Sequence, residues 1–113
     1  MYQKIIPVLP AISLSKTAQF YRDKLGFTVQ HYGANIVVIK NNIELSFTEH
    51  AVKSAMPLSE FLIYVTNVED LYSLYCGIDI VLPGGQMKSI GSKPKEFTVI
   101  DNNGHRLRFL QAV

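Results

Sequence analysis

The chain has 113 residues, a formal net charge of +2 and an apolar fraction of 48%. This length suits a compact domain with its own core, and the apolar content excludes a disordered chain. No apolar run reaches the roughly 20 residues that a bilayer span needs, and the first residues lack the apolar region of a signal peptide. The single cysteine, Cys76, has no partner for an intrachain disulfide. We therefore expect a soluble cytoplasmic protein.

The basic residues are spread along the chain rather than gathered into a stripe. Lys88, Lys93 and Lys95 form one loose group. They lack the interleaved aromatic residues that are typical of a nucleic-acid-binding surface, and a solvated loop explains them better. We therefore expect neither nucleic acid nor a membrane among the partners.

The first half of the chain predicts a strand, a helix and three further strands. The apolar segment 4–9 contains Pro7, which indicates an edge strand or a break at Pro7, and the segment ends at Pro10. Ser13 is a good helix N-cap and Gly26 a good residue after a helix end, and apolar residues recur at helical spacing between them. Apolar or alternating patterns predict the three strands, at 27–32, 35–40 and 43–48.

The second half predicts the same order of elements. Asn67 followed by Asp70 is close to a capping box, and Gly77 ends the helix that they begin. Four segments around this helix predict strands, at 61–65, 78–82, 96–100 and 106–111. The stretch 83–95 is rich in proline and glycine and predicts a long loop.

A local similarity between the halves favours an internal duplication. The segments Val38–Asn42 and Val99–Asn103 resemble each other, and each leads into a Leu-x-Phe sequence. Two copies of a βαβββ module, at about 1–50 and about 60–113, imply an α+β fold with helices on the outer face of each sheet.

Three stretches match the pattern of a known superfamily. They are Phe20–Phe27 (Phe-Tyr-Arg-Asp-Lys-Leu-Gly-Phe), the strand and capped helix at 61–71, and Val99–Leu110 with its Asp-Asn-Asn-Gly turn. In these stretches the chain resembles the vicinal oxygen chelate superfamily, which holds glyoxalase I, bleomycin resistance proteins, fosfomycin resistance proteins and extradiol dioxygenases. It looks most like the bleomycin resistance proteins. The resemblance implies one domain over 1–113, a cup-shaped mixed sheet of two paired modules and, commonly, a homodimer.

The resemblance also bears on metal binding, because metal-dependent members hold ligands at four strand positions. The matching positions here are Ile6, Glu44, Glu60 and Arg108. Isoleucine and arginine cannot be ligands, so the metal set is broken and we expect no metal, no cofactor and no catalytic residue. The alternative is a metal-dependent lyase, isomerase or dioxygenase of the superfamily. That alternative needs ligands outside the matched set, such as His50 or Glu49.

The histidines and the single cysteine do not form a set of metal ligands in the sequence. His31, His50 and His105 show no paired ligand spacing, so we interpret each as a surface or hydrogen-bonded histidine. We interpret Cys76, near a helix end, as a small apolar packing residue.

Strand alternation predicts which side chains face away from the helices and into the cup. The candidate ligand-binding residues on these faces are Glu44, Ser46, Leu62, Tyr64, Arg106 and Arg108. Apolar walls with a few polar groups are typical of a small-molecule pocket. Two roles stay open for Arg108, which either pairs with Glu44 or binds an anionic or carbonyl group of a ligand.

The leading hypothesis is therefore a non-catalytic protein similar to bleomycin resistance proteins, which sequester an antibiotic. It holds a small molecule non-covalently in a cleft at a homodimer interface. Bleomycin itself is a poorer candidate, since the chain has no tryptophan and a net positive charge. The other hypotheses are the metal-dependent enzyme and an interaction module without a ligand.

Overall fold

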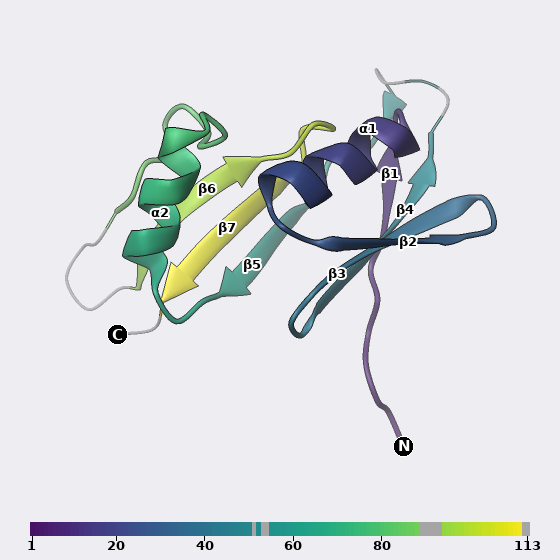
Figure 1. Ribbon diagram of the computed structural model, residues 1–113, viewed down its shortest axis with the longest axis horizontal. Coiled ribbons are helices and arrows are strands. Elements are labelled where there is room, and N and C mark those ends of the chain that lie inside the picture. Colours follow the sequence, from purple (N-terminus) through teal and green to yellow (C-terminus); the bar gives the residue numbers. More distant parts are fainter. Residues whose placement is uncertain (51, 53–54, 89–93, 112–113) are drawn as a thin grey trace. The chain divides into compact units, whose positions relative to one another are not determined.

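The structure, a computed structural model, describes residues 1–50, 52, 55–88 and 94–111. The chain divides into two compact units, Met1–Pro57 and Leu58–Val113. Each unit contains one mixed sheet, of four strands in the first and three in the second (Figure 1). Helices and mixed sheets together confirm the predicted α+β class.

The first unit follows the predicted βαβββ order. Its elements are β1 (Val8–Ala11), α1 (Leu14–Gln19), the π-helix η1 (Phe20–Lys24), β2 (Thr28–Tyr32), β3 (Asn35–Lys40) and β4 (Ile43–Glu49). The strand order is β1-β4-β3-β2, in which β1 runs parallel to β4 and the other neighbours are antiparallel. β1 is thus an edge strand, which is one of the two structures that Pro7 predicted.

The first strand is shifted from its predicted position. It begins at Val8 rather than Lys4, and Pro10 lies inside it rather than at its end. The carbonyl of Pro7 accepts a hydrogen bond from the Ser46 N–H of β4 at 2.9 Å, and that of Ala11 accepts one from the N–H of His50, just after β4, at 2.7 Å. The backbone of Pro10 therefore points to the outer edge of the sheet, where a missing N–H costs no ladder bond.

The predicted helix limits are confirmed in this unit. Ser13 accepts a hydrogen bond from the backbone N–H of Lys16 at 3.2 Å, and Gly26 has a φ of +75°, which favours glycine. The helix side of the sheet carries the core. The ring of Tyr21 packs 5.1 Å from that of Phe47, and both side chains are fully buried.

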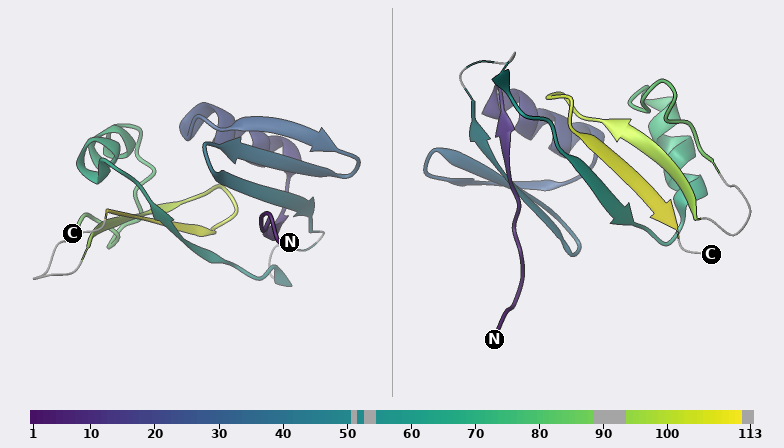
Figure 2. Two further views of the ribbon diagram at one scale, coloured as in Figure 1. Left: turned by 90° about the horizontal axis from the view of Figure 1, so that it is seen from below. Right: turned by 180° about the vertical axis from the view of Figure 1, so that it is seen from behind.

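In the described residues, the second unit has one strand fewer than predicted. Its elements are β5 (Glu60–Tyr64), α2 (Val68–Gly77), β6 (Lys95–Ile100) and β7 (Arg106–Gln111), and the strand order is β5-β7-β6. α2 covers one side of this sheet, as the left view of Figure 2 shows. The Asn67 side chain caps α2 by accepting the Asp70 N–H at 3.3 Å, and Gly77 is its last residue, as predicted.

Aromatic side chains join α2 to its sheet. The rings of Tyr72 and Tyr75 lie 5.1 and 6.2 Å from that of Phe97, which stacks on Phe109 at 5.3 Å. Leu107 is also buried. Strand alternation therefore places the other face of β7, with Arg106 and Arg108, away from the helix, as predicted.

The predicted strand 78–82 was wrong. Val81 forms a single bridge with Val99, although the backbone beyond it continues beside β6. The N–H of Leu82 donates to the Thr98 carbonyl, and the N–H of Thr98 donates to the Gly85 carbonyl, both at 2.9 Å. Pro83 lies between these two contacts and has no N–H, so the ladder is interrupted there.

Beyond the interruption the segment returns to β6. Lys88 and Glu96 exchange two backbone hydrogen bonds of 2.8 and 3.0 Å. The predicted loop at 83–95 is therefore partly bound to the sheet, and its residues 89–93, with Lys93, lie outside the described residues.

No helix in the described part of the chain is long and apolar enough to cross a bilayer.

Candidate ligand-binding site

A depression of about 260 Å³ lies in the second unit. Its lining residues come from all three strands and from the segment beside β6: Glu60, Gly84, Gly85, Gln86, Lys88, Glu96, Phe97, Thr98, Arg106 and Arg108. Most of the strand residues among them lie on the sheet face that points away from α2. The depression is thus formed within one unit, by elements whose register is known.

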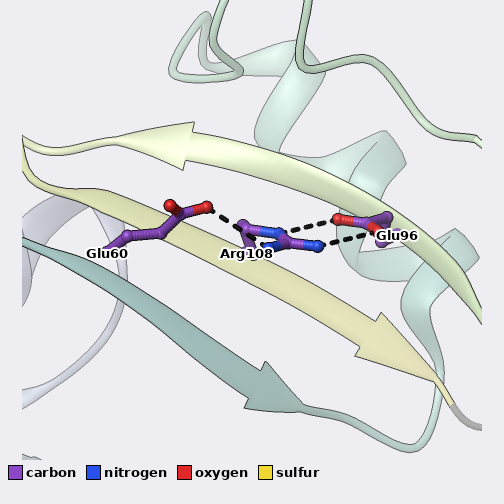
Figure 3. A network of polar contacts seen from close by, with 3 residues as sticks. All are labelled: Glu60, Glu96 and Arg108. Carbon is purple, nitrogen blue, oxygen red and sulfur yellow. Dashed lines mark hydrogen bonds and ion pairs between the residues drawn. The ribbon is translucent and has the colours of Figure 1, made fainter.

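Arg108 contacts both carboxylates of this depression. Its Nε donates to Oε2 of Glu96 at 2.9 Å and its Nη2 donates to Oε1 of Glu96 at 3.0 Å. Its Nη1 lies 3.4 Å from Oε1 of Glu60. Figure 3 shows the guanidinium of β7 between a carboxylate of β5 and one of β6. This arrangement is a bidentate ion pair with a second, longer contact.

The two carboxylates favour the charged form of Arg108. The hydrogen bond from Arg108 to Glu96 raises the arginine pKa above its already high ordinary value, and Glu60 adds to this effect. The guanidinium therefore stays charged at every pH at which the protein folds, and its planar geometry holds the Glu96 carboxylate in one orientation.

The strand register explains why these three side chains meet. Arg108 lies between Leu62 of β5 and Thr98 of β6 in the ladder, and Glu60 and Glu96 are each two residues away from those neighbours. Residues two apart on a strand share a face, so both carboxylates are diagonal neighbours of the arginine. Long side chains reach across such diagonals.

The predicted site residues of the second unit are partly brought together. Arg106 and Arg108 line the depression. Leu62 and Tyr64 share the face of β5 that carries Glu60 and are 57% and 65% exposed, but they are not among the lining residues. A role for these two side chains in ligand binding stays a prediction.

The predicted site residues of the first unit have other surroundings. Glu44 forms an ion pair with Lys4 at 3.1 Å, and Ser46 is buried in β4. Within the second unit, the carboxylate partners of Arg108 are Glu96 and Glu60. Whether Glu44 and Ser46 contact a ligand stays a prediction.

Sequence reasoning missed several lining residues. Glu96 was assigned only to a strand, although hairpin pairing of 96–100 with 106–111 would have placed it near Arg108. Thr98 shares that strand face and could have been found in the same way. Gly84, Gly85, Gln86 and Lys88 were assigned to a loop, and no sequence signal shows that this loop returns to the sheet.

The four matched metal positions do not fit a metal ion. Ile6 is apolar and Arg108 is a cation, while each of Glu44 and Glu60 has a basic partner. In the described part of the chain, no group of three or more histidine, cysteine, aspartate and glutamate residues is arranged to hold a metal ion. The alternative ligand His50 already accepts the Val52 N–H at its Nδ1, at 3.3 Å.

Two other predicted residues can be placed. His105 is fully buried, and its Nδ1 accepts a hydrogen bond from the backbone N–H of Ser59 at 3.0 Å. Of the two predicted roles, surface histidine or hydrogen-bonded histidine, His105 has the second. The interpretation of Cys76 as a packing residue was wrong. It is exposed, because it lies on a side of α2 that does not face the sheet.

Comparison with known proteins gives the class of this fold. A family model described as a glyoxalase superfamily protein matches residues 1–113, so the chain belongs to the glyoxalase superfamily. Within it, the chain is similar to the bleomycin resistance proteins of Geobacillus stearothermophilus and Staphylococcus aureus. Each is 25% identical over 126 residues, which cover 96% of this chain and 96% of the relative.

Solved structures show the same fold. A bleomycin resistance determinant encoded on transposon Tn5 has a TM-score of 0.76 at 18% identity, with 98% of both chains covered. The bleomycin-binding protein of Streptomyces verticillus, complexed with copper(II)-bleomycin, has a TM-score of 0.74 at 22% identity and covers 100% of this chain and 98% of its own. These matches confirm the predicted resemblance to bleomycin resistance proteins.

Proposed function

We propose that this protein binds a small molecule non-covalently at the depression around Arg108, as a sequestering protein similar to bleomycin resistance proteins. The observation that carries the proposal is the depression itself, whose polar side chains are held in place by a bidentate ion pair. A site whose polar groups are oriented before binding loses little entropy when the ligand arrives.

The cluster retains hydrogen-bonding capacity for a ligand. A guanidinium has five N–H donors, and Arg108 directs three of them at Glu96 and Glu60 in the described structure. The remaining donors, the Thr98 hydroxyl and the Gln86 amide supply polar contacts. The backbone of Gly84 and Gly85 allows a ligand to approach closely.

A second subunit forms part of the proposal. Leu62 and Tyr64 are 57% and 65% exposed on one face of β5, and apolar side chains on such a face favour a symmetric partner. We expect a homodimer in the cytoplasm that completes the cleft, without nucleic acid or a membrane as partner. Light scattering at micromolar concentration checks the assembly, and a monomeric mass would contradict it.

Binding is tested with the isotope-labelled protein. We expect bleomycin or a member of a library of drug-sized molecules to shift the backbone amide signals of Gly85, Thr98 and Arg106 in a saturable way. Gln86→Trp should weaken this binding by filling the depression. The matched control is Gln19→Trp, on the exposed side of α1, which should leave it unchanged. If the ligands shift only the amide signals of other residues, the proposed location of the binding site is wrong.

The same preparation tests the metal-dependent alternative. Elemental analysis of protein purified without chelator should find far less than one divalent metal ion per chain, since the matched ligand positions do not fit one. A tightly held stoichiometric metal ion, together with turnover of a bound molecule, would favour the enzyme instead.

A further inference from the structure

The depression contains two cations that none of the described residues neutralises. Arg106 and Lys88 both line it and both are exposed. In the described residues, neither side chain has a hydrogen bond or an ion pair, whereas Arg108 is paired with both carboxylates of the depression. The depression thus contains one cation with carboxylate partners, Arg108, and two cations without such partners in the described residues, Arg106 and Lys88.

The charge balance of the lining residues is positive. Three cations, Lys88, Arg106 and Arg108, stand against two carboxylates, Glu60 and Glu96. The positions outside the described residues are alanine, valine, lysine, serine, isoleucine and glycine, so they carry no acidic side chain that could neutralise the excess. A ligand with a negative charge is the complement of this site.

The two unpaired cations have backbones in well-defined positions. The N–H of Arg106 donates to the Ser59 carbonyl at 2.9 Å, and the preceding residue, His105, is buried. Lys88 exchanges its two backbone hydrogen bonds with Glu96. The arginine side chain can therefore present its planar N–H groups to an acid group without reordering the strand.

The two cations cannot share one small acid group. Arg106 pairs with Ile100 and Lys88 with Glu96, and these partners lie at opposite ends of a four-residue step along β6, roughly 13 Å at the usual rise per strand residue. One cation therefore makes the direct contact and the other acts over a longer range. Arginine is better suited to the contact, because its fork matches two oxygens of a carboxylate, phosphate or sulfonate.

We propose that the ligand is an organic anion whose acid group binds the guanidinium of Arg106, while Lys88 adds positive potential at the other end of the depression. This inference rests on the proposed function and names its ligand class. Arg108 then acts as a positioning residue, because it holds Glu60 and Glu96 away from the acid group.

The test uses simple aromatic probes with the whole protein at low salt. Benzoate, phenyl phosphate and benzenesulfonate differ in their acid group, benzamide is neutral and benzylamine is cationic. Amide shifts at Gly85, Thr98 and Arg106 give the dissociation constant of each probe. We expect at least one anion to bind about tenfold more tightly than benzamide, since one charge-assisted contact corresponds to roughly that factor.

Variants separate the two cations. Arg106→Gln should raise the dissociation constant of the anion about tenfold and leave that of benzamide unchanged. Lys88→Gln should raise the dissociation constant of the anion only about twofold. Arg22→Gln and Lys24→Gln remove the same charges from the exposed side of η1 and should have no effect. Gln86→Trp keeps both cations and shows whether the anion occupies the depression.

The outcomes distinguish the two proposals. If benzamide or benzylamine binds at these amides at least as tightly as every anion, or if Arg106→Gln leaves anion binding unchanged, the anion inference is wrong and the proposed function stands. If none of the five probes, bleomycin or the library shifts these amides, both are wrong.

Discussion

Arg108 and Glu96 are joined by two hydrogen bonds although they are not paired in the backbone ladder between β6 and β7. Arg108 pairs with Thr98, and Glu96 pairs with Leu110. The contact is therefore diagonal, and both side chains must extend along the strands to make it. Such geometry gives the cluster an energetic coupling that can be measured.

The coupling between these two residues should be about 1 kcal/mol. A bidentate arginine–carboxylate pair exceeds a simple surface pair, but both side chains keep about a third of their surface exposed, which screens the interaction. A double-mutant cycle with Arg108→Met and Glu96→Gln, measured by urea unfolding, gives the value. The Lys4–Glu44 pair serves as the control and should couple more weakly, because Lys4 is 64% exposed. Equal coupling in the two cycles would contradict the prediction.

Lys95 controls the titration of Glu69. The Lys95 ammonium donates a hydrogen bond to the Glu69 carboxylate, and this contact holds the pKa of Glu69 below its ordinary value. Folding then favours the charged carboxylate, so this stabilisation is present above the ordinary pKa and is lost as the pH falls through the lower folded value. Lys95→Met should raise the Glu69 pKa toward the ordinary value in a carboxyl NMR titration. Lys88→Met is the control and should leave it where it is.

Tyr75 should limit stability at alkaline pH. Its burial against Phe97 and Phe109 raises the pKa of the phenol, so the folded protein resists ionisation that the unfolded chain undergoes near pH 10. Stability is therefore complete below about pH 10 and falls as the pH rises toward the higher folded pKa. Tyr75→Phe should flatten this fall in the free energy of unfolding. The same change at Tyr32, which is 60% exposed, is the matched control for removing a tyrosine hydroxyl.

Gly85 leaves no space for a side chain at the floor of the depression. A Cβ built there would lie 2.9 Å from the Cβ of Thr98 and 3.1 Å from that of Leu82. Gly85→Ala should therefore destabilise the protein by about 1–3 kcal/mol through overpacking, measured as a lower urea midpoint. Gly77→Ala, at the end of α2 with open space around its Cβ, should instead stabilise by about 0.5–1 kcal/mol. A neutral Gly85→Ala would show that β6 and its neighbouring segment separate easily.

Much of the fold could be predicted because its signals are local. Ser13 and Asn67 cap their helices through bonds to residues three positions away, and Gly26 has the positive φ that its position suggested. Alternation along β7 correctly separated Arg106 and Arg108 from the buried Leu107. These features depend on neighbours in the sequence, which a single chain displays directly.

The site was harder to predict because it depends on partners far along the chain. Strand alternation placed Glu44 and Arg108 on the same predicted cup face, but it did not reveal that strand pairing within the second unit brings Glu96 and Glu60 beside Arg108. The predicted strand 78–82 failed for a local reason. Its apolar residues suit a strand, but Ile78 and Asp79 form the turn that follows α2, where Asp79 has a φ of +58° and its N–H donates to the Cys76 carbonyl at 3.2 Å.

The break at Pro83 and Gly84 also has an evolutionary consequence. Backbone hydrogen bonds hold the segment to β6 at Leu82 before the break and at Lys88 after it, so the exposed Gln86 between them can change while both attachments persist. Substitutions at Gln86 would then alter the rim of the depression without disturbing the aromatic core under α2. A lineage could in this way acquire selectivity for new ligands while it keeps the same scaffold.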